Sequence, residues 1–266
     1  MNEVNKTLYI PLYGKALVSK KGIIVKDEKA EEIWSSAGLK LKGKAKSKWL
    51  AYFMAMRTWV FDYFTMQKIS QLKGATVLHL GCGLDGRILR ISPTKNYWYD
   101  VDFEKVILER KRFYSETELY KMLSADVKNC EFIKKLPKTE SAIVILEGVS
   151  MYFTNEELTN LLKELSKHYK NLSVLLDCYT PFAVKMSKFK NPVKTVGVNK
   201  VYGVKSPYEL ENESGLTFIK EHSLTPKNLI NQLNGIERVI FNRVYAGKIS
   251  KKLYKLYEYE KVNDKT

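Results

Sequence analysis

Histidine, cysteine and acidic residues are all scarce in this chain of 266 residues, which holds three histidines and three cysteines. Cys82, Cys130 and Cys178 lie far apart and form no Cys-x-x-Cys pair, which excludes a disulfide framework and a cysteine zinc site. Unpaired thiols indicate a reducing compartment. No run reaches about 18 uninterrupted apolar residues, and residues 1–6 do not begin a signal peptide. We expect a cytoplasmic protein with no membrane partner and no metal site.

The charge balance is strongly basic, with 45 lysines and arginines against 29 acids and a formal net charge of +16. Lysines alternate through 40–48, and six more occur in 185–205 with no acid between them. A basic excess can indicate nucleic acid or an anionic membrane. Neither segment shows the arginine and aromatic pattern typical of RNA-binding surfaces. We interpret most of these lysines as solvated loop residues, so nucleic acid is not the expected partner.

The first 70 residues are predicted to be mainly helical. Asp27 precedes a segment with acids in its first turn, which predicts a helix with Asp27 as its N-cap. Apolar residues recur every three or four positions through 47–69, which predicts a long amphipathic helix. The chain length predicts one large domain, or one domain with an appendage, at roughly 150 residues per domain. We therefore separate a helical segment, 1–70, from the domain at 71–266.

From residue 75 onward, short apolar runs alternate with amphipathic segments. The predicted helices are 103–114 and 155–169, the second capped by Thr154. Strands are predicted at 75–80, 96–101, a weaker segment before Asp126, 141–146 and 171–177. Strands that alternate with helices predict an α/β fold with a doubly wound, mostly parallel sheet.

The remainder of the chain is less regular. Residues 180–207 form a basic insertion after the fifth strand that contains glycine and proline. We predict closing strands at 215–222 and 236–245, with a helix between them at 226–233. The tail, 250–262, is polar and has tyrosines at helical spacing.

A glycine-rich loop, 81–86, follows the first predicted strand and opens toward a helix. Gly81 and Gly83 allow a tight turn and the close approach of a ligand to the backbone. Asp102 follows Gly81 by 21 residues and ends the second predicted strand, where a carboxylate can accept hydrogen bonds from both hydroxyls of a ribose. This arrangement predicts a nucleoside cofactor.

Two nucleoside cofactors fit the loop, a nicotinamide dinucleotide and S-adenosylmethionine. A dinucleotide places a pyrophosphate at the helix terminus, where Asp85 would repel it. S-adenosylmethionine carries a sulfonium and an ammonium, which acids tolerate. Asp126 follows the third predicted strand, and Glu147 ends the fourth, where the methionine ammonium or the substrate would lie. Four acids along one sheet edge favour the cationic cofactor.

The sequence resembles the leucine carboxyl methyltransferase family, in particular a bacterial branch that methylates small carboxylates or polyketide-type products. The more specific shared elements are Gly-Leu-Asp-x-Arg at 83–87 and Glu-Gly-x-x-Met-Tyr at 147–152. The shared motifs follow the family order from residue 7 to about residue 178. They comprise 7–16, Arg57 with Phe61 and Asp62, 80–87, 100–102, 126–127 and 147–154. The part after residue 178 matches poorly, and we expect it to shape the substrate site.

The resemblance implies a Rossmann-like class I methyltransferase with residues 1–70 as an N-terminal helical lid. It implies cofactor contacts at Arg57 for the methionine carboxylate, at the backbone of Gly81, and at Asp102 for the ribose. Further cofactor contacts are implied along the rest of the site, at Lys15, Gly83, Asp85, Asp126, Val127 and Glu147. Lys15 stands where the family usually has arginine, and Val127 stands where it usually has leucine.

The expected activity is O-methylation of a small acidic metabolite or polyketide-like compound. The methyl group would be transferred to a carboxylate or to a hydroxyl. A carboxylate acceptor is already ionised at neutral pH and needs no base, whereas Glu147 or Tyr152 could assist a hydroxyl. We interpret His79 as a core residue, and the lack of a well-placed histidine favours the carboxylate. The alternatives are a nucleic-acid methyltransferase, a nicotinamide-dependent reductase and a non-catalytic binding module. The sequence has no base-methylation motif of the Asn-Pro-Pro-Tyr type, which counts against the first of these.

Overall fold

The computed structural model describes residues 4–36, 38, 41, 43–93, 95–189, 200–247 and 252–261. Several lysines of the two basic segments, and residues 190–199 of the predicted insertion, lie outside this part of the chain. None of the described helices is long and apolar enough to cross a membrane.

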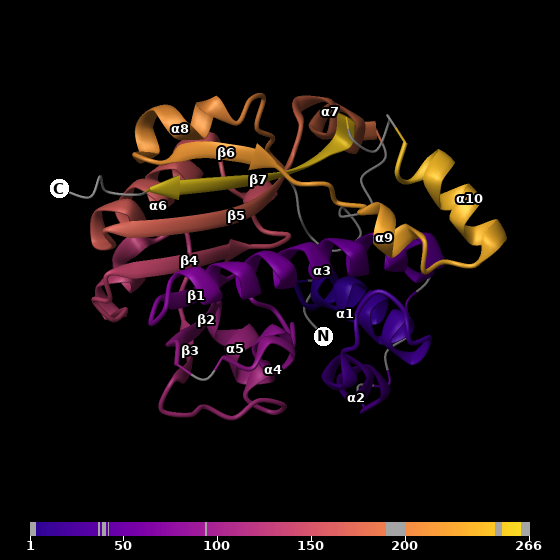
Figure 1. Cartoon of the computed structure of the whole chain (residues 1–266), viewed down its shortest axis with the longest axis horizontal. Helices are drawn as coiled ribbons and strands as arrows, with labels where there is room; N and C mark the ends of the chain where they lie inside the picture. Colours follow the sequence, from indigo (N-terminus) through magenta and orange to yellow (C-terminus); the bar gives the residue numbers. More distant parts are fainter. Residues whose placement is uncertain are drawn as a thin grey trace.

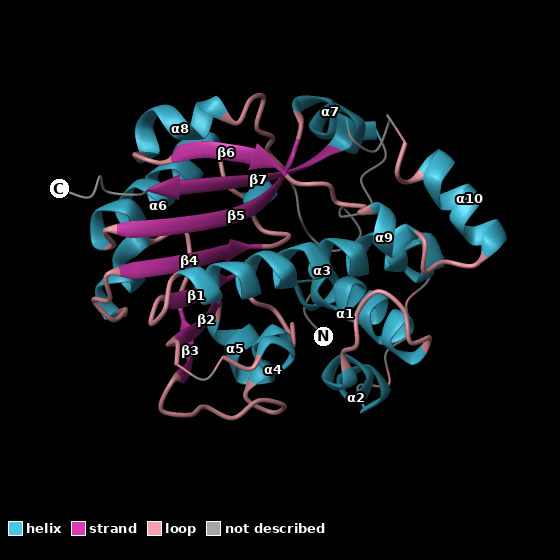
Figure 2. Ribbon diagram, viewed as in Figure 1, coloured by secondary structure: helices cyan, strands magenta, loops and turns pink. Residues whose placement is uncertain are grey.

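The centre of the molecule is a seven-stranded sheet with the order β3-β2-β1-β4-β5-β7-β6 (Figures 1 and 2). β1 to β5 run parallel, and β7 pairs antiparallel with both β5 and β6. The strands are β1 (Thr76–Leu80), β2 (Trp98–Asp102), β3 (Tyr120–Ser124), β4 (Ser141–Leu146), β5 (Asn171–Tyr179), β6 (Thr217–Glu221) and β7 (Tyr254–Lys261). The five parallel strands confirm the predicted doubly wound, Rossmann-like class I fold.

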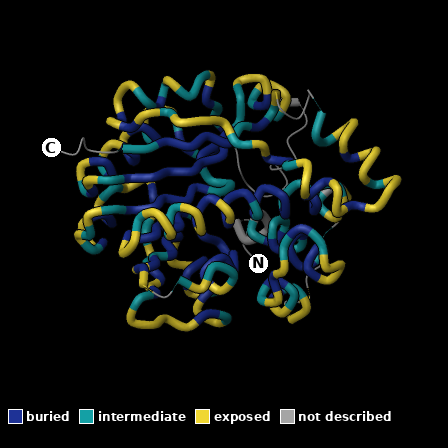
Figure 3. The backbone as a smooth tube through the Cα atoms, viewed as in Figure 1, coloured by how far each residue is buried: buried dark blue, intermediate teal, exposed yellow. Residues whose placement is uncertain are grey.

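Each face of the sheet buries its own apolar core, so the central strands are buried along nearly their whole length (Figure 3). One core packs the sheet against α3 (Lys48–Gln71), α4 (Arg87–Ile91) and α5 (Glu104–Arg110). The other packs it against α6 (Asn155–His168) and α8 (Tyr208–Ser214). The Thr154 cap is confirmed, since its hydroxyl accepts the Glu157 N–H at 3.1 Å within a full capping box.

The first two helices lie outside α3, which itself packs on the sheet. α1 (Val4–Lys20) packs on α3, and α2 (Glu28–Ser36) packs on α1. The Asp27 cap is confirmed by the Ala30 N–H, which donates to its carboxylate at 2.8 Å. A third apolar cluster joins α1 and α3 to the C-terminal helices α9 (Lys227–Ile230) and α10 (Gly235–Val244) (Figure 1).

Two predictions for the C-terminal region were wrong. The predicted strand at 236–245 is instead occupied by helix α10, which ends at Val244. Asn234 caps this helix and accepts the Glu237 N–H at 2.9 Å, while Phe241 anchors one helical face in the core. The tail holds strand β7 instead of helical turns. Tyr254 and Leu256 pack on one face of the sheet, and Tyr257 and Tyr259 pack on the other. The tyrosine spacing therefore reflects a strand that is buried on both sides.

Candidate cofactor and active site

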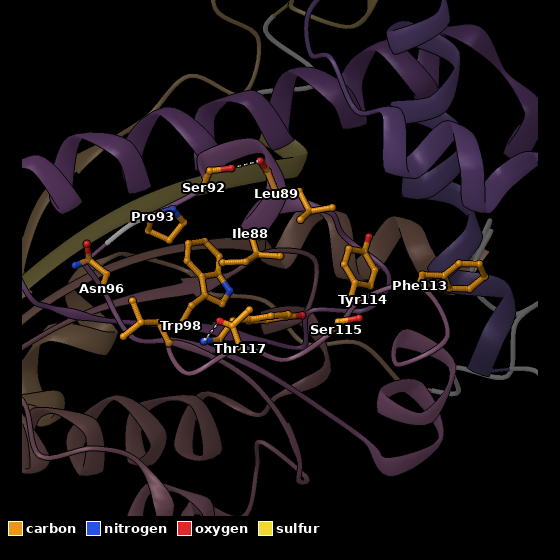
Figure 4. Close-up of a pocket in the computed structure, with 12 residues that line it drawn as sticks. Ile88, Leu89, Ser92, Pro93, Asn96, Trp98, Phe113, Tyr114, Ser115 and Thr117 are labelled. Carbon is orange, nitrogen blue, oxygen red and sulfur yellow. Dashed lines mark hydrogen bonds between the residues drawn. The ribbon is translucent and has the colours of Figure 1, made fainter.

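Two cavities of about 510 Å³ each are present in the described part of the chain. One, drawn in Figure 4, lies at the amino ends of β2 and β3, beside Trp98 and Tyr120, and no charged side chain lines it. The other lies at the carboxyl ends of the parallel strands and is lined by the glycine loop, Asp102 and Glu147. Ligands of open α/β sheets bind at the carboxyl ends of the strands, so the second cavity is the candidate site.

The glycine loop makes one wall of this cavity, and its shape depends on glycine. Gly81 and Gly83 have φ values of +69° and +54°. A Cβ added to Gly81 would lie 2.2 Å from Cγ1 of Val149, a distance that no packed pair of carbons can adopt. Because these two positions lack a side chain, the backbone of the loop is accessible from the cavity.

Asp102 joins the end of β2 to the glycine loop. Its carboxylate accepts the Gly83 N–H at 2.8 Å and, through the other oxygen, the Phe103 N–H at 2.8 Å. Burial raises the pKa of Asp102, and these two backbone donors oppose that rise. The described residues supply it with no ion-pair partner, so this acid is positioned by backbone alone and faces the cavity.

Arg110 supports the loop from behind, a role that the sequence analysis missed. Its Nη1 donates to the Gly83 carbonyl at 3.1 Å, and its guanidinium lies 4.1 Å from the ring centroid of Tyr114. The Tyr114 hydroxyl donates to the Leu84 carbonyl at 3.0 Å. A carboxylate, Asp100, pairs with the guanidinium in the core. Tyr114, which lines the cavity in Figure 4, thus also braces the candidate site.

Arg57 lies at the centre of the opposite wall. Its Nε donates to Glu147 at 3.1 Å, and its Nη1 donates to Asp177 and to the Tyr254 hydroxyl, each at 2.9 Å. Within the described residues its Nη2 has no hydrogen-bond partner. A Cβ at Gly148 would lie 3.3 Å from that nitrogen, so the glycine keeps the space beside it open.

Glu147 is fully engaged by side chains around it. It accepts hydrogen bonds from Arg57 and, at 2.9 Å, from the Thr58 hydroxyl, and its second oxygen pairs with Arg87. Burial alone would raise the pKa of Glu147, but Arg87 and Arg57 lower it to about 2. Glu147 is therefore a fixed carboxylate and a poor proton acceptor at neutral pH.

Lys15 and Asp85 pair with each other across the mouth of the loop, and both line the cavity. A carboxylate oxygen of Asp85 also accepts a hydrogen bond from Nη2 of Arg90 at 2.9 Å. Arg90 and nearby cations hold the pKa of Asp85 well below its usual range, although burial acts in the opposite direction. The structure thus brings Lys15, from the N-terminal helix, into the same site as the glycine loop.

Two predicted cofactor residues, Asp126 and Val127, follow β3. Val127 lines the cavity, as does Ala125. Asp126 is exposed, is absent from the cavity lining among the described residues, and accepts the Lys128 N–H at 3.0 Å. A cofactor contact by Asp126 therefore stays a prediction.

Aromatic side chains gather at the Arg57 end of the cavity, where the rings of Phe53 and Tyr179 lie against that of Tyr254. They come from α3, from the segment after β4 and from β5 to β7, and they are Phe53, Tyr152, Tyr179, Tyr245 and Tyr254. Burial raises the pKa of Tyr152 to about 12, so its hydroxyl stays protonated at neutral pH. No described residue hydrogen-bonds that hydroxyl, which leaves it free to donate to a ligand.

His79 also lines the cavity but is buried as a core residue. Its Nε2 lies 3.0 Å from Nη1 of Arg87, and because arginine only donates, this nitrogen must accept. Burial and the positive charge of Arg87 lower the pKa of His79. The imidazole is therefore neutral and already committed to a structural hydrogen bond.

Comparison with known proteins decides the family. Residues 3–166 match the family model described as Leucine carboxyl methyltransferase, which is more than half of the chain. The chain belongs to the leucine carboxyl methyltransferase family. It is a methyltransferase that depends on S-adenosylmethionine, as the resemblance of its motifs implied, and the reductase alternative is set aside.

Curated relatives of this family member span most of its length. The tetracenomycin polyketide synthesis O-methyltransferase TcmP of Streptomyces glaucescens is 26% identical over 241 residues, covering 88% of each chain. An S-adenosyl-L-methionine-dependent methyltransferase of Gibberella zeae is 25% identical over 183 residues, covering 63% of this chain and 61% of its own.

Solved structures show the same fold at low identity. A putative methyltransferase from Thermobifida fusca has a TM-score of 0.57 at 11% identity, covering 84% of this chain and 90% of its own. Magnesium protoporphyrin IX methyltransferase from Synechocystis PCC 6803, crystallised with S-adenosylhomocysteine, has a TM-score of 0.52 at 10% identity, covering 88% and 93%. These likenesses confirm the Rossmann-like methyltransferase architecture.

Proposed function

We propose that this protein transfers the methyl group of S-adenosylmethionine to an oxygen of a small aromatic or polyketide-like molecule, a carboxylate or a hydroxyl. The observation that carries the proposal is the aromatic end of the cavity, which shares one cavity with the glycine loop and Asp102. Stacked and edge-on contacts with phenylalanine and tyrosine favour a flat, apolar acceptor. The TcmP relative is named for polyketide synthesis, which supports the same acceptor class.

The residues of the cavity wall fit this cofactor. The free Nη2 of Arg57 is the donor that would bind the methionine carboxylate, and a planar guanidinium held by Glu147 and Asp177 keeps that donor in a fixed direction. Asp102 would accept the ribose hydroxyls, and the open backbone at Gly81 would let the cofactor approach. We expect micromolar binding, about −8 kcal/mol.

When bound, the cofactor supplies an activated methyl group, so the chain's own work is to bind, orient and exclude water. Tyr152 is the side chain we assign to the acceptor, because its protonated hydroxyl has no protein partner and can orient the acceptor oxygen. Glu147 acts as a positioning residue for Arg57 and Arg87. Tyr152 is therefore the catalytic residue that we assign, and Glu147 contributes only through the arginines that it holds.

The positive net charge of the protein favours an anionic acceptor mainly by attracting it toward the protein from solution. The cations on the cavity wall, Lys15 and Arg57, are already paired with acids. A net charge of +16 instead raises the encounter rate with anionic small molecules. The helix α1 contributes Leu8, Pro11 and Lys15 to the wall, so we assign it the lid over the cofactor.

A methyl-transfer screen tests this proposal. Purified protein is incubated with methyl-labelled cofactor and with aromatic carboxylic acids, phenols and a mixed RNA, and the products are identified by mass. We expect the label on one class of aromatic acceptor. Label on RNA alone would contradict the proposal and support a nucleic-acid methyltransferase.

A further inference from the structure

Behind the cofactor wall, buried acids and bases form one continuous network of ion pairs. Arg57 pairs with Asp177 and Glu147, and Glu147 pairs with Arg87. From Arg87 the contacts continue through Asp62 to Arg90. Arg90 also pairs with Asp27 and with Asp85. Asp85 in turn pairs with Lys15, which ends the network.

This network contains more carboxylates than cations. Its cations are Lys15, Arg57, Arg87 and Arg90, and its carboxylates are Asp27, Asp62, Asp85, Glu147 and Asp177. Among the described residues no further cation pairs with any of these carboxylates, so the network carries one net negative charge. The network members on the cavity wall, Lys15, Arg57, Asp85 and Glu147, balance one another in charge. The next carboxylate behind them is Asp177, which is bonded to Arg57 and to the backbone of Gly148, two residues of that wall.

Asp177 is the carboxylate at the end of the network nearest the aromatic half of the cavity. One oxygen accepts Arg57 Nη1 at 2.9 Å and the Tyr254 hydroxyl at 2.7 Å, and the other accepts the Gly148 N–H at 2.8 Å. The Arg57 guanidinium and the Gly148 N–H can only donate, and the Tyr254 hydroxyl donates as well, so the three contacts favour the acceptor-only, ionised form of the side chain. Asp177 is fully buried, so water does not screen its charge.

The charge of the cofactor changes during the reaction. S-adenosylmethionine has a carboxylate, an ammonium and a sulfonium, and it therefore carries one net positive charge. S-adenosylhomocysteine has lost the sulfonium charge and is neutral overall. A buried site with one excess negative charge attracts the donor and attracts the product less, because unscreened charges act strongly at low effective dielectric.

We propose that Asp177 makes the cofactor site select the cationic donor over the neutral product, while it positions Arg57 through the shared contact with Tyr254. The proposal rests on the cofactor site described above. It assigns a role to a residue that touches neither the cofactor nor the acceptor: Asp177 supplies charge and orientation from behind the wall.

The test compares two ligands that differ in this one charge. Sinefungin has a protonated amine in place of the methyl sulfonium and does not react, and S-adenosylhomocysteine is neutral. Calorimetry on the full chain gives the ratio of their dissociation constants for the wild type, Asp177→Asn and Asp177→Ser. Glu258→Gln is the matched control, because it neutralises a buried carboxylate that pairs with Lys68 outside the network.

We expect the preference for sinefungin over S-adenosylhomocysteine to fall about tenfold in both Asp177 variants, and to stay unchanged in Glu258→Gln. Tyr254→Phe keeps the charge and should keep the preference, even where the affinity for both ligands drops. A folded Asp177 variant with the wild-type preference overturns the proposal. So does a wild type that binds the neutral ligand far more tightly than sinefungin, a result that needs no variant to fold. A wild type that binds neither ligand contradicts the cofactor site itself.

Discussion

The carboxylate of Asp102 accepts the backbone N–H of Gly83 at 2.8 Å, so the end of β2 is bonded directly to the glycine loop that follows β1. The two residues are 19 positions apart in the chain. This bond fixes the acid against the loop before any ligand arrives, and it holds Asp102 in the cavity wall, where we propose that it contacts the cofactor.

Replacing Asp102 tests that double role. Asp102→Ala should weaken binding of S-adenosylhomocysteine by roughly 1.5–3 kcal/mol, because hydrogen bonds to a charged acceptor are lost. The fold should survive, since the side chain lies at the cavity rather than in the apolar core. Calorimetry gives the affinity, with the exposed Glu118→Ala as control. An unchanged dissociation constant in folded Asp102→Ala would remove this residue from the site.

Alanine substitutions at two glycines with nearly equal φ angles distinguish the cost of backbone strain from the cost of a steric clash. Gly81 has a φ of +69° and would place a Cβ 2.2 Å from Val149, whereas Gly22 has a φ of +67° and open space around it. Gly22→Ala should cost only the left-handed strain, about 1–2 kcal/mol. Gly81→Ala should cost more stability and lose cofactor binding, because Val149 and the loop must move. Chemical denaturation of both variants measures the difference, and equal losses would show that the close approach does not matter.

The Tyr152 hydroxyl should affect turnover and leave cofactor binding alone. Tyr152→Phe removes one neutral hydrogen bond to the acceptor, which predicts a loss of kcat/KM of about three- to tenfold. Its affinity for S-adenosylhomocysteine should equal that of the wild type. Steady-state kinetics on the first accepted substrate check this, with the exposed Tyr97→Phe as control. A weaker cofactor affinity at full kcat would place Tyr152 in the cofactor site instead.

Acid should destabilise the protein partly through Glu147. Arg87 and Arg57 lower the pKa of this carboxyl to about 2 from an ordinary value of 4.5. A depressed pKa means that the stabilisation is complete above about pH 4.5 and is lost as the pH falls toward about 2. The loss for this group is on the order of 3 kcal/mol. Urea denaturation across this range should show a shallower decline in Glu147→Gln, and the wild-type slope in the exposed variant Glu156→Gln.

The N-terminal helix should respond to the cofactor if it is a lid. α1 contributes Leu8, Pro11 and Lys15 to the cavity wall, so a bound cofactor would hold it in place. Hydrogen exchange of residues 7–17 should slow when S-adenosylhomocysteine is added. Equal protection with and without the ligand, together with full activity after removal of residues 1–17, would refute the lid.

The parallel sheet and its main acids could be predicted because their signals are local. Each strand is a short apolar run, and a carboxylate at its end reaches the same sheet edge as its neighbours. Asp177 carries this signal too, since it ends the predicted strand 171–177, but only the structure shows that it pairs with Arg57, 120 positions away. The pairing of Lys15 with Asp85 likewise joins residues 70 positions apart and leaves no local pattern.

The C-terminal region could not be predicted from periodicity. β7 is buried on both faces between β5 and β6, so its tyrosines follow the needs of two cores and show no simple alternation. Helix α10 is rich in β-branched residues, and most of its side chains are exposed, which weakens the helical pattern. In β7 tertiary contacts override the local propensity, whereas α10 depends on its Asn234 cap and on the buried Phe241.

The most direct test of the account is methyl transfer from deuterated S-adenosylmethionine to a panel of aromatic carboxylic acids and phenols, read by mass spectrometry. The account predicts one labelled ester or ether and an equal amount of S-adenosylhomocysteine, with both lost in Asp102→Ala at limiting cofactor. Binding of S-adenosylhomocysteine without transfer to any aromatic acceptor, combined with transfer to RNA or protein, would contradict it.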